Sequence, residues 1–358
     1  MIAQTKAVAA ALGLPNSKIV LADVIGSGSG GWAWGRCKNG TVIEVLGRAV
    51  TIWPHPQARW LISDFTGWKH RPLPFDGPVV YHLPRGAYFE YAFLDAAGRP
   101  FADPDNPDHA DNPWHSYARA VRLPGAPQPP EYSRELLGAV ERMSAGGRRL
   151  LVYEPPEPPR ACLLVFDGVA YYRLGRVAHA AEKLWLEGRV VPLRIVFSEP
   201  RQREREYRFD LGLEKLVLDD LPAALAGLGG PACSAVWGAS LGGLAALWLA
   251  LKHPDVFTAV AAQSPALLAE PGGKDAHSDP EWLRDRYQEA ARLPRRLSMQ
   301  VGLLEWLLPP VRRFAAVIAE RGAVHEYREY PSGHNWHTWR LGIEAGLVDL
   351  FGADLEVG

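Results

Sequence analysis

Hydrophobic positions change their pattern about a third of the way along the chain. Between residues 31 and 124 the apolar stretches are short and closely spaced, as in TVIEVLG, VTIWPH, ARWLISDF, VVYHLP and AYFEYAFLD. Turn sequences such as DG, PRG and AAG separate them. Short apolar runs divided by turns are typical of antiparallel strands. This region therefore predicts a β-sandwich.

Beyond the proline-rich segments PGAPQPPEYS and EPPEPPR, strands alternate with helices. Strands are predicted at ACLLVFDG, VPLRIVFSE, ACSAVWG, FTAVAAQSP, RLSMQVG and VHEYREYP, and helices at 177–188, 213–228, 241–253, 310–321 and from His337 onward. Continuous apolar strands alternating with helices form parallel sheets that are covered on both faces. The second region therefore predicts an α/β domain.

The prolines mark a linker and an exposed loop, so we place the domain boundary near residues 124–135. A chain of 358 residues exceeds the usual size of one domain. We predict an N-terminal β-domain over residues 1–124 and an α/β-domain over residues 125–358.

Composition excludes several classes of partner. The net charge of −1 provides no general attraction to nucleic acid or anionic lipid. No apolar run reaches the about 18 residues that a membrane span needs. The start, MIAQTKAVAAALGLPNS, reads as an amphipathic helix rather than an export signal, because its apolar run is short and alanine-rich. We expect a cytoplasmic protein without nucleic-acid or membrane partners.

Cys37, Cys162 and Cys233 are widely separated and include no CxxC pair. An odd number of isolated cysteines favours reduced, mostly buried thiols over zinc ligands or a redox dithiol. We therefore expect no metal site in this chain.

The segment AVWGASLGG contains the motif G-x-S-x-G, with Ser240 at its centre. A predicted strand precedes it and a predicted helix follows, which is the setting of a nucleophile elbow. Gly238 and Gly242 allow the close backbone approach that such a turn needs. The amide of Leu241 would then face a developing oxyanion at the helix start.

A serine nucleophile needs a base, and the base of an α/β-hydrolase follows the last strand. PSGHNWH offers His334 in the loop and His337 at the start of the final helix, and the loop position favours His334. Glu305, after RLSMQVG, is the candidate acid, with Asp279 and Asp285 as alternatives.

A second oxyanion donor is expected in the loop after the first core strand, at the amide of Gly168 or Val169. Arg203 and Arg205 in RQREREYR suit anionic or catecholate substrates, although a solvated charged loop fits them equally. Trp336 beside the histidine and Trp114 in DNPWHSY are candidates for lining the substrate cleft.

These residues resemble the enterochelin (ferric siderophore) esterases and related esterase-D-like enzymes. The resemblance rests on LLVFDG, RQREREYRFDLGLEKLVLDDLPAAL, AVWGASLGGLAALWLALKHPDVFTAVAAQSPALL and PSGHNWHTWRLGIEAGLVDLF, in that order. It implies an α/β-hydrolase three-layer sandwich preceded by an all-β, immunoglobulin-like early-set domain. By resemblance, Ser240 and His334 take the nucleophile and base positions, and Glu305 falls where the acid is expected.

The N-terminal run DFTGWKHRPLPFDGPVVYHLPRGAYFEYAFLDAAGRPFADPDNP resembles the glycogen-binding module of the AMP-activated kinase β subunit. It departs from that module at Ala92, where the module has a lysine, and it lacks the second sugar-stacking tryptophan. Trp68 is the remaining candidate for stacking on a sugar, or it is a structural aromatic.

The sequence therefore predicts a serine esterase that uses a Ser-His-Glu triad and needs no metal or organic cofactor. Its expected partner is a small-molecule ester, and a ferric siderophore would bring its own iron. Two alternatives stay open: an esterase for feruloyl or acetyl carbohydrate esters, and a non-catalytic glycan-binding protein.

Overall fold

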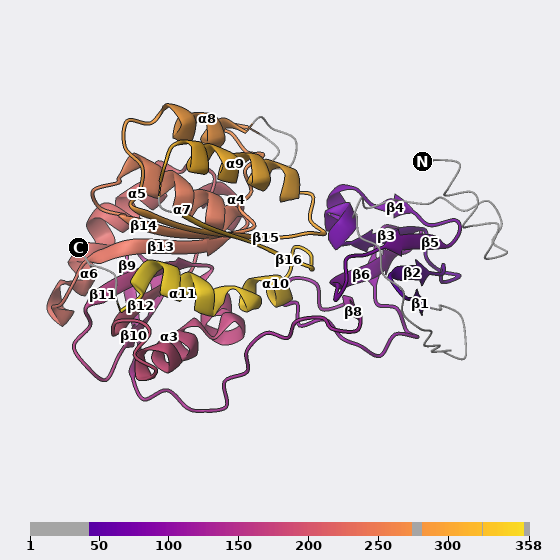
Figure 1. Ribbon diagram of the computed structural model, residues 1–358, viewed down its shortest axis with the longest axis horizontal. Helices are drawn as coiled ribbons and strands as arrows, with labels where there is room; N and C mark the ends of the chain where they lie inside the picture. Colours follow the sequence, from indigo (N-terminus) through magenta and orange to yellow (C-terminus); the bar gives the residue numbers. More distant parts are fainter. Residues whose placement is uncertain (1–42, 274–280, 324, 354–358) are drawn as a thin grey trace. The chain divides into compact units, whose positions relative to one another are not determined.

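The computed structural model describes residues 43–273, 281–323 and 325–353, which belong to two compact units (Figure 1). The predicted first helix, Cys37 and Asp279 lie outside the described residues. The first unit runs to Gln128 and also contains Gly302–Trp306 and Pro331–His337, and the second unit contains the rest. Two short segments from the C-terminal half thus pack with the N-terminal unit, an arrangement that no single boundary describes.

The first unit contains two antiparallel sheets. One has the order β1-β2-β5, and the other has the order β4-β3-β6-β7 with β8 also paired to β6. The strands are β1 (Ile43–Leu46), β2 (Ala49–Ile52), β3 (Trp60–Ser63), β4 (Leu73–Pro74), β5 (Val79–His82), β6 (Tyr88–Leu94), β7 (Pro100–Phe101) and β8 (Arg119–Arg122), with the short helices η1 (Asp64–Thr66) and η2 (Trp68–His70) after β3. This β-rich arrangement confirms the predicted all-β character of the N-terminal region.

Strand β6 shows how the first unit is packed, because all seven of its residues are buried. Successive side chains of a strand point to opposite faces. Phe89, Tyr91 and Phe93 join a core with residues of β2, β3 and β5, so both sheets share one apolar interior. The alternate residues, Glu90 among them, face the other side of the sheet.

The second unit is built on an eight-stranded sheet with the order β16-β15-β14-β13-β11-β12-β10-β9. Its strands are β9 (Ala139–Ala145), β10 (Arg148–Glu154), β11 (Ala161–Phe166), β12 (Leu193–Ser198), β13 (Cys233–Ala239), β14 (Ala259–Gln263), β15 (Arg296–Gly302) and β16 (His325–Tyr330). Strands β11 to β15 pair in parallel, whereas β9 and β10 are antiparallel. The predicted α/β architecture is confirmed.

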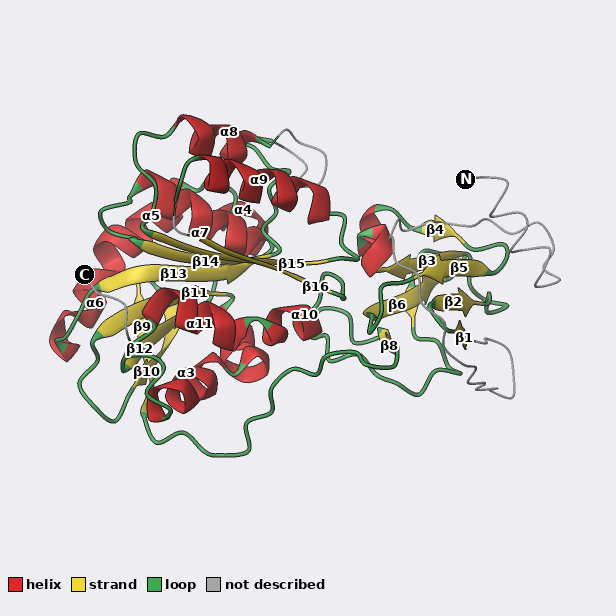
Figure 2. Ribbon diagram, in the orientation of Figure 1, coloured by secondary structure: helices red, strands yellow, loops and turns green. Residues whose placement is uncertain are grey.

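Helices cover both faces of this sheet, with α3 and α11 on one face and α8 and α9 on the other (Figures 1 and 2). The helices of this unit are α2 (Gly168–Ala170), η3 (Tyr171–Gly175), α3 (Val177–Leu186), α4 (Arg203–Glu206), α5 (Leu211–Lys215), η4 (Leu216–Asp220), α6 (Leu221–Leu225), η5 (Ala226–Leu228), α7 (Leu241–Lys252), α8 (Trp282–Glu289), α9 (Leu308–Glu320) and α11 (Ile343–Phe351), and α10 (Trp336–Leu341) begins in the first unit. None of the helices in the described ranges is long and apolar enough to cross a membrane.

The final helix is interrupted where the sequence predicts one continuous element. It begins at Trp336 rather than His337 and breaks at Gly342 between α10 and α11. A Cβ at Gly342 would overlap the side chain of Gln300, 1.4 Å away. Close packing of this strand residue against the helix backbone therefore accounts for the glycine at the break.

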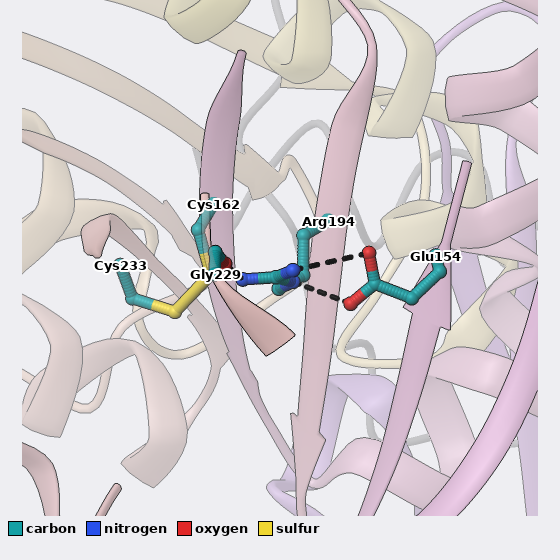
Figure 3. The surroundings of a disulfide bond; sticks show 5 residues. All are labelled: Glu154, Cys162, Arg194, Gly229 and Cys233. Carbon is teal, nitrogen blue, oxygen red and sulfur yellow. Dashed lines mark hydrogen bonds and ion pairs between the residues drawn. A yellow bond between two sulfur atoms is a disulfide. The ribbon is translucent and has the colours of Figure 1, made fainter. Parts of the chain in front are cut away.

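Cys162 of β11 and Cys233 of β13 are register partners, and a disulfide joins them (Figure 3). The expectation of reduced thiols is wrong for this pair. Arg194, the partner of Cys162 on β12, lies beside the disulfide and binds the carboxylate of Glu154 and the carbonyl of Gly229 (Figure 3). No local pattern indicates this pairing, because the residues are 71 positions apart.

The disulfide predicts a specific thiol count. Denatured protein without reductant should titrate one thiol per chain, that of Cys37, and three after reduction. Reduction should also lower the free energy of unfolding, by up to about 4 kcal/mol for a loop of this length. Three titratable thiols before reduction would contradict the cross-link.

Candidate active site

Ser240 lies at a strained turn between strand β13 and helix α7. Its backbone has φ 55° and ψ −121°, a combination that residues other than glycine rarely adopt. A Cβ at Gly238 would lie 2.3 Å from the backbone of Gly242, so the chain closes this turn only with glycine at the first position. This is the local geometry predicted for a nucleophile elbow.

Gln263, at the end of the neighbouring strand β14, holds this turn. Its carbonyl accepts a hydrogen bond from the Ser240 amide at 2.9 Å, and its buried side chain bonds Trp237, Tyr171 and the carbonyl of Trp339. Gln263 thereby ties the elbow to three other elements. A lone glutamine in an apolar strand gave no signal of this role in the sequence.

The turn after β11 lies at the same edge of the sheet, because parallel strands end at a common edge. Asp167 adopts a left-handed conformation with φ 51°, and its amide donates to the hydroxyl of Tyr207 at 2.9 Å. Gly168 passes close to β12, since a Cβ there would lie 2.5 Å from the backbone carbon of Phe197. The candidate second oxyanion donors therefore sit on a tightly fixed turn.

The two candidate donors on this turn differ in their surroundings. The Val169 amide donates to Oε2 of Glu199 at 3.0 Å, so in this structure a carboxylate occupies it. Burial raises the pKa of Glu199, and the negative charge of Asp167 adds to this rise, whereas the bond from Val169 opposes it. Leu241, the candidate donor on the elbow, is the first residue of α7 and is buried.

Arg203, a predicted substrate ligand, instead forms a two-pronged ion pair with Asp167. Its Nε lies 2.8 Å and its Nη2 2.9 Å from the carboxylate oxygens of Asp167, and Nη2 also reaches the carbonyl of Ala239 at 3.5 Å. Arg203 thus links the Asp167 turn to the residue before Ser240. Arg205 is different, because its side chain is 75% exposed and pairs with Asp210 at 3.4 Å.

Glu305 and His334, the predicted acid and base, lie together in the first unit. Nδ1 of His334 is 2.8 Å from Oε2 of Glu305, whose side chain is fully buried. The other oxygen of Glu305 accepts from the amide of Gly302 at 2.8 Å. With Nδ1 directed at a carboxylate, Nε2 of the ring is left as the atom that can exchange a proton with a substrate group.

The alternative acid and base residues have other surroundings. His337 is buried and stacks on Tyr88, with ring centroids 3.8 Å apart. Asp285 lies in α8, is exposed and pairs with Arg284. His334 and Glu305 are therefore the pair whose arrangement suits acid–base chemistry.

The aromatic candidates divide by exposure. Trp336 is fully buried, with its ring centroid 5.7 Å from that of Trp114. Trp114 is 42% exposed and offers surface to a ligand. Trp68 is 5% exposed and stacks on His115 at 4.1 Å, which is the environment of a structural aromatic rather than a sugar platform.

Within the described ranges, no group of three or more His, Cys, Asp or Glu side chains is arranged to hold a metal ion. The chemistry available from the residues above is that of a serine, a histidine–carboxylate pair and backbone amides.

Comparison with known proteins relates the chain to esterases. The family model described as Esterase matches residues 147–350. The iron(III) salmochelin esterase of Escherichia coli is 23% identical over 239 residues, which is 62% of this chain and only 58% of that protein.

Solved structures of esterases share the fold. The enterobactin esterase of Shigella flexneri, crystallised in the presence of enterobactin, superposes with a TM-score of 0.66 at 18% identity, covering 87% of this chain and 96% of its own. The ferric enterobactin esterase of Salmonella typhimurium gives 0.61 at 17% identity, with the same coverage. These likenesses confirm the predicted α/β-hydrolase architecture preceded by a β-rich region.

The Arg203–Asp167 pair predicts a stability difference. Asp167 is 7% exposed, so Arg203→Ala would leave a buried carboxylate without its cation and should cost about 3 kcal/mol. Arg312 makes a similar two-pronged pair with Glu329, but its side chain is 53% exposed, so Arg312→Ala should cost less than about 1 kcal/mol. Urea unfolding measures both, and equal losses would contradict this assignment.

Proposed function

Since the chain belongs to the esterase family, we propose that it is a carboxylic ester hydrolase and that Ser240 is its nucleophile. His334 is the general base, and Glu305 orients its imidazole. The observation that carries the proposal is the backbone of Ser240, φ 55° and ψ −121° between β13 and α7. Strain of this kind is retained where it presents a reactive side chain.

The reaction follows acyl-enzyme chemistry. Oγ of Ser240 attacks the ester carbonyl carbon while Nε2 of His334 takes the hydroxyl proton. The same proton passes to the departing alcohol. A water molecule then attacks the acyl-enzyme while His334 takes a proton from it, and this proton returns to Oγ of Ser240 as the acid is released. Glu305, accepting from Nδ1, stabilises the imidazolium that forms in both steps.

The negative oxygen of the tetrahedral intermediate needs amide donors. The amide of Leu241 at the start of α7 supplies one, and the Asp167–Gly168 turn supplies the other. Of the two candidates there, Val169 can receive the oxyanion once its amide leaves Glu199, 3.0 Å away in the present structure.

We propose further that the natural substrate is an ester of a catecholate siderophore, bound with its iron as cargo. The proposal is supported by the similarity to proteins named salmochelin and enterobactin esterases. Arg205, which is 75% exposed, offers a cation to an anionic catecholate, and Trp114, 42% exposed, offers an aromatic surface.

Removing the nucleophile tests the proposed chemistry. Ser240→Ala should lower kcat for p-nitrophenyl butyrate by at least about 10⁴-fold, because no other group forms the acyl-enzyme. Ser234→Ala, in the same strand β13, is the control and should keep wild-type turnover. Equal turnover by Ser240→Ala and wild type would overturn the proposal.

The substrate proposal has its own test. A ferric catecholate trilactone, its iron-free form, an acetylated sugar and a feruloyl sugar ester are compared by kcat/KM, with Ser240→Ala as the blank. The trilactones should be cleaved most efficiently. Preferred cleavage of either sugar ester would reject the siderophore assignment while leaving the triad in place.

A further inference from the structure

Asp64 and Glu90, in the described part of the first unit, are fully buried carboxylates outside the proposed triad. Asp64 begins η1, directly after β3, and Glu90 lies in β6 on the face opposite the shared apolar core. Burying a carboxylate is costly unless hydrogen bonds compensate it. Such groups therefore indicate a role beyond packing.

Asp64 contacts the loop that carries His334 on both sides of the histidine. Its Oδ2 accepts from Nδ2 of Asn335 at 2.8 Å and from the amide of Glu90 at 2.8 Å. On the other side, a Cβ at Gly333 would lie 2.2 Å from Cγ of Asp64. The carboxyl group thus occupies the space that the glycine leaves open.

The same unit holds both ends of this loop. The amide of Tyr88 in β6 donates to the carbonyl of Pro331 at 2.9 Å, and the Tyr88 ring stacks on His337. The guanidinium of Arg122 in β8 lies over the Tyr88 ring, 4.6 Å from its centroid. The loop is therefore anchored before and after His334 by residues of the β-sheet.

The acid-bearing segment is held in the same way. Leu304 donates its amide to the carbonyl of Ser332 at 3.0 Å and adds its side chain to the apolar core of the sheets. A Cβ at Gly67 would lie 3.4 Å from the ring of Trp306, and the centroid of that ring lies 4.6 Å from the ring centroid of His334. Both segments of the acid–base pair thus belong to the β-unit.

We propose that Asp64 is a positioning residue for the general base, through which the N-terminal β-unit fixes the loop of His334. The inference rests on the proposed role of His334 in ester hydrolysis. Asp64 does not touch the substrate. It sets the place of the imidazole by holding Asn335 and by filling the space at Gly333.

The residues around Asp64 also affect the pKa of its carboxyl group. Burial raises the pKa of Asp64 to about 7, and the hydrogen bonds from Glu90 and Asn335 oppose this rise. The negative charge of Glu305 raises the pKa of Asp64 further, whereas the charge of His334 lowers it. Glu90 faces Asp64 and has its own pKa raised to about 8 by burial and by Asp64, with Tyr88, Asn112 and Asp111 around it.

Asp64→Ala and Asp64→Asn test the proposal with Asp103→Asn as the matched control. Asp103 is a buried carboxylate of the same unit that accepts from Tyr91 at 2.6 Å. A displaced base is expected to lower kcat of Asp64→Ala by about 100-fold, with KM unchanged within about twofold. Asp103→Asn should keep wild-type kcat.

Asp64→Asn keeps the size of the side chain and removes its charge. This variant still fills the space at Gly333 and can still accept the hydrogen bond from Asn335, so its kcat should recover to within about tenfold of wild type. Asn335→Ala removes the same hydrogen bond from the loop side. The kcat of the double variant Asp64→Ala/Asn335→Ala should therefore be no lower than the kcat of either single variant.

All rates are given per active site, and the active sites are counted by fluorophosphonate titration. A smaller fraction of folded protein therefore does not lower the measured kcat. Wild-type kcat in Asp64→Ala, an equal loss in Asp103→Asn, or a loss in Asp64→Asn as large as that in Asp64→Ala would overturn the role of Asp64. Wild-type protein that neither hydrolyses esters nor reacts with the probe would instead overturn the proposed function.

Discussion

A serine held in a left-handed turn is the constraint on which the α/β unit depends. The backbone of Ser240 costs about 1 to 3 kcal/mol relative to relaxed geometry. The glycine at 238, the hydrogen bond from the Ser240 amide to Gln263 and the buried start of α7 maintain it. The strain places a hydroxyl at the edge of the sheet where β11 and β13 end, beside the turn at Asp167 that Arg203 fixes.

The acid and the base depend on a different part of the molecule. Glu305 and His334 follow β15 and β16 in the chain, yet their segments pack with the β-rich unit. A hydrogen bond from Asn335 to Asp64 joins the histidine loop to the short helix η1, which follows β3. In an esterase that uses His334 as its base, the N-terminal unit therefore helps to orient that base. This role explains why the carboxylate of Asp64 is buried in the β-rich unit.

Local patterns predicted the elements, whereas long-range polar contacts could not be predicted. Short apolar runs indicated the strands, and the glycine spacing around Ser240 indicated the elbow, because both depend on near neighbours in the chain. The Asp64–Asn335 bond joins residues 271 positions apart, and Cys162 and Cys233 are 71 apart. Such partners leave no periodic trace in a single sequence. The pairing of Arg203 with Asp167 could not be predicted for the same reason, since the two residues meet only once β11 and α4 lie together.

Covalent labelling tests the central claim most directly. Wild-type protein is treated with a fluorophosphonate probe, digested, and mapped by mass spectrometry. The account predicts one adduct, on Ser240 in the segment AVWGASLGG, and a labelling rate at least about 100-fold lower in His334→Ala. An adduct on another serine, or labelling unaffected by His334→Ala, would contradict it.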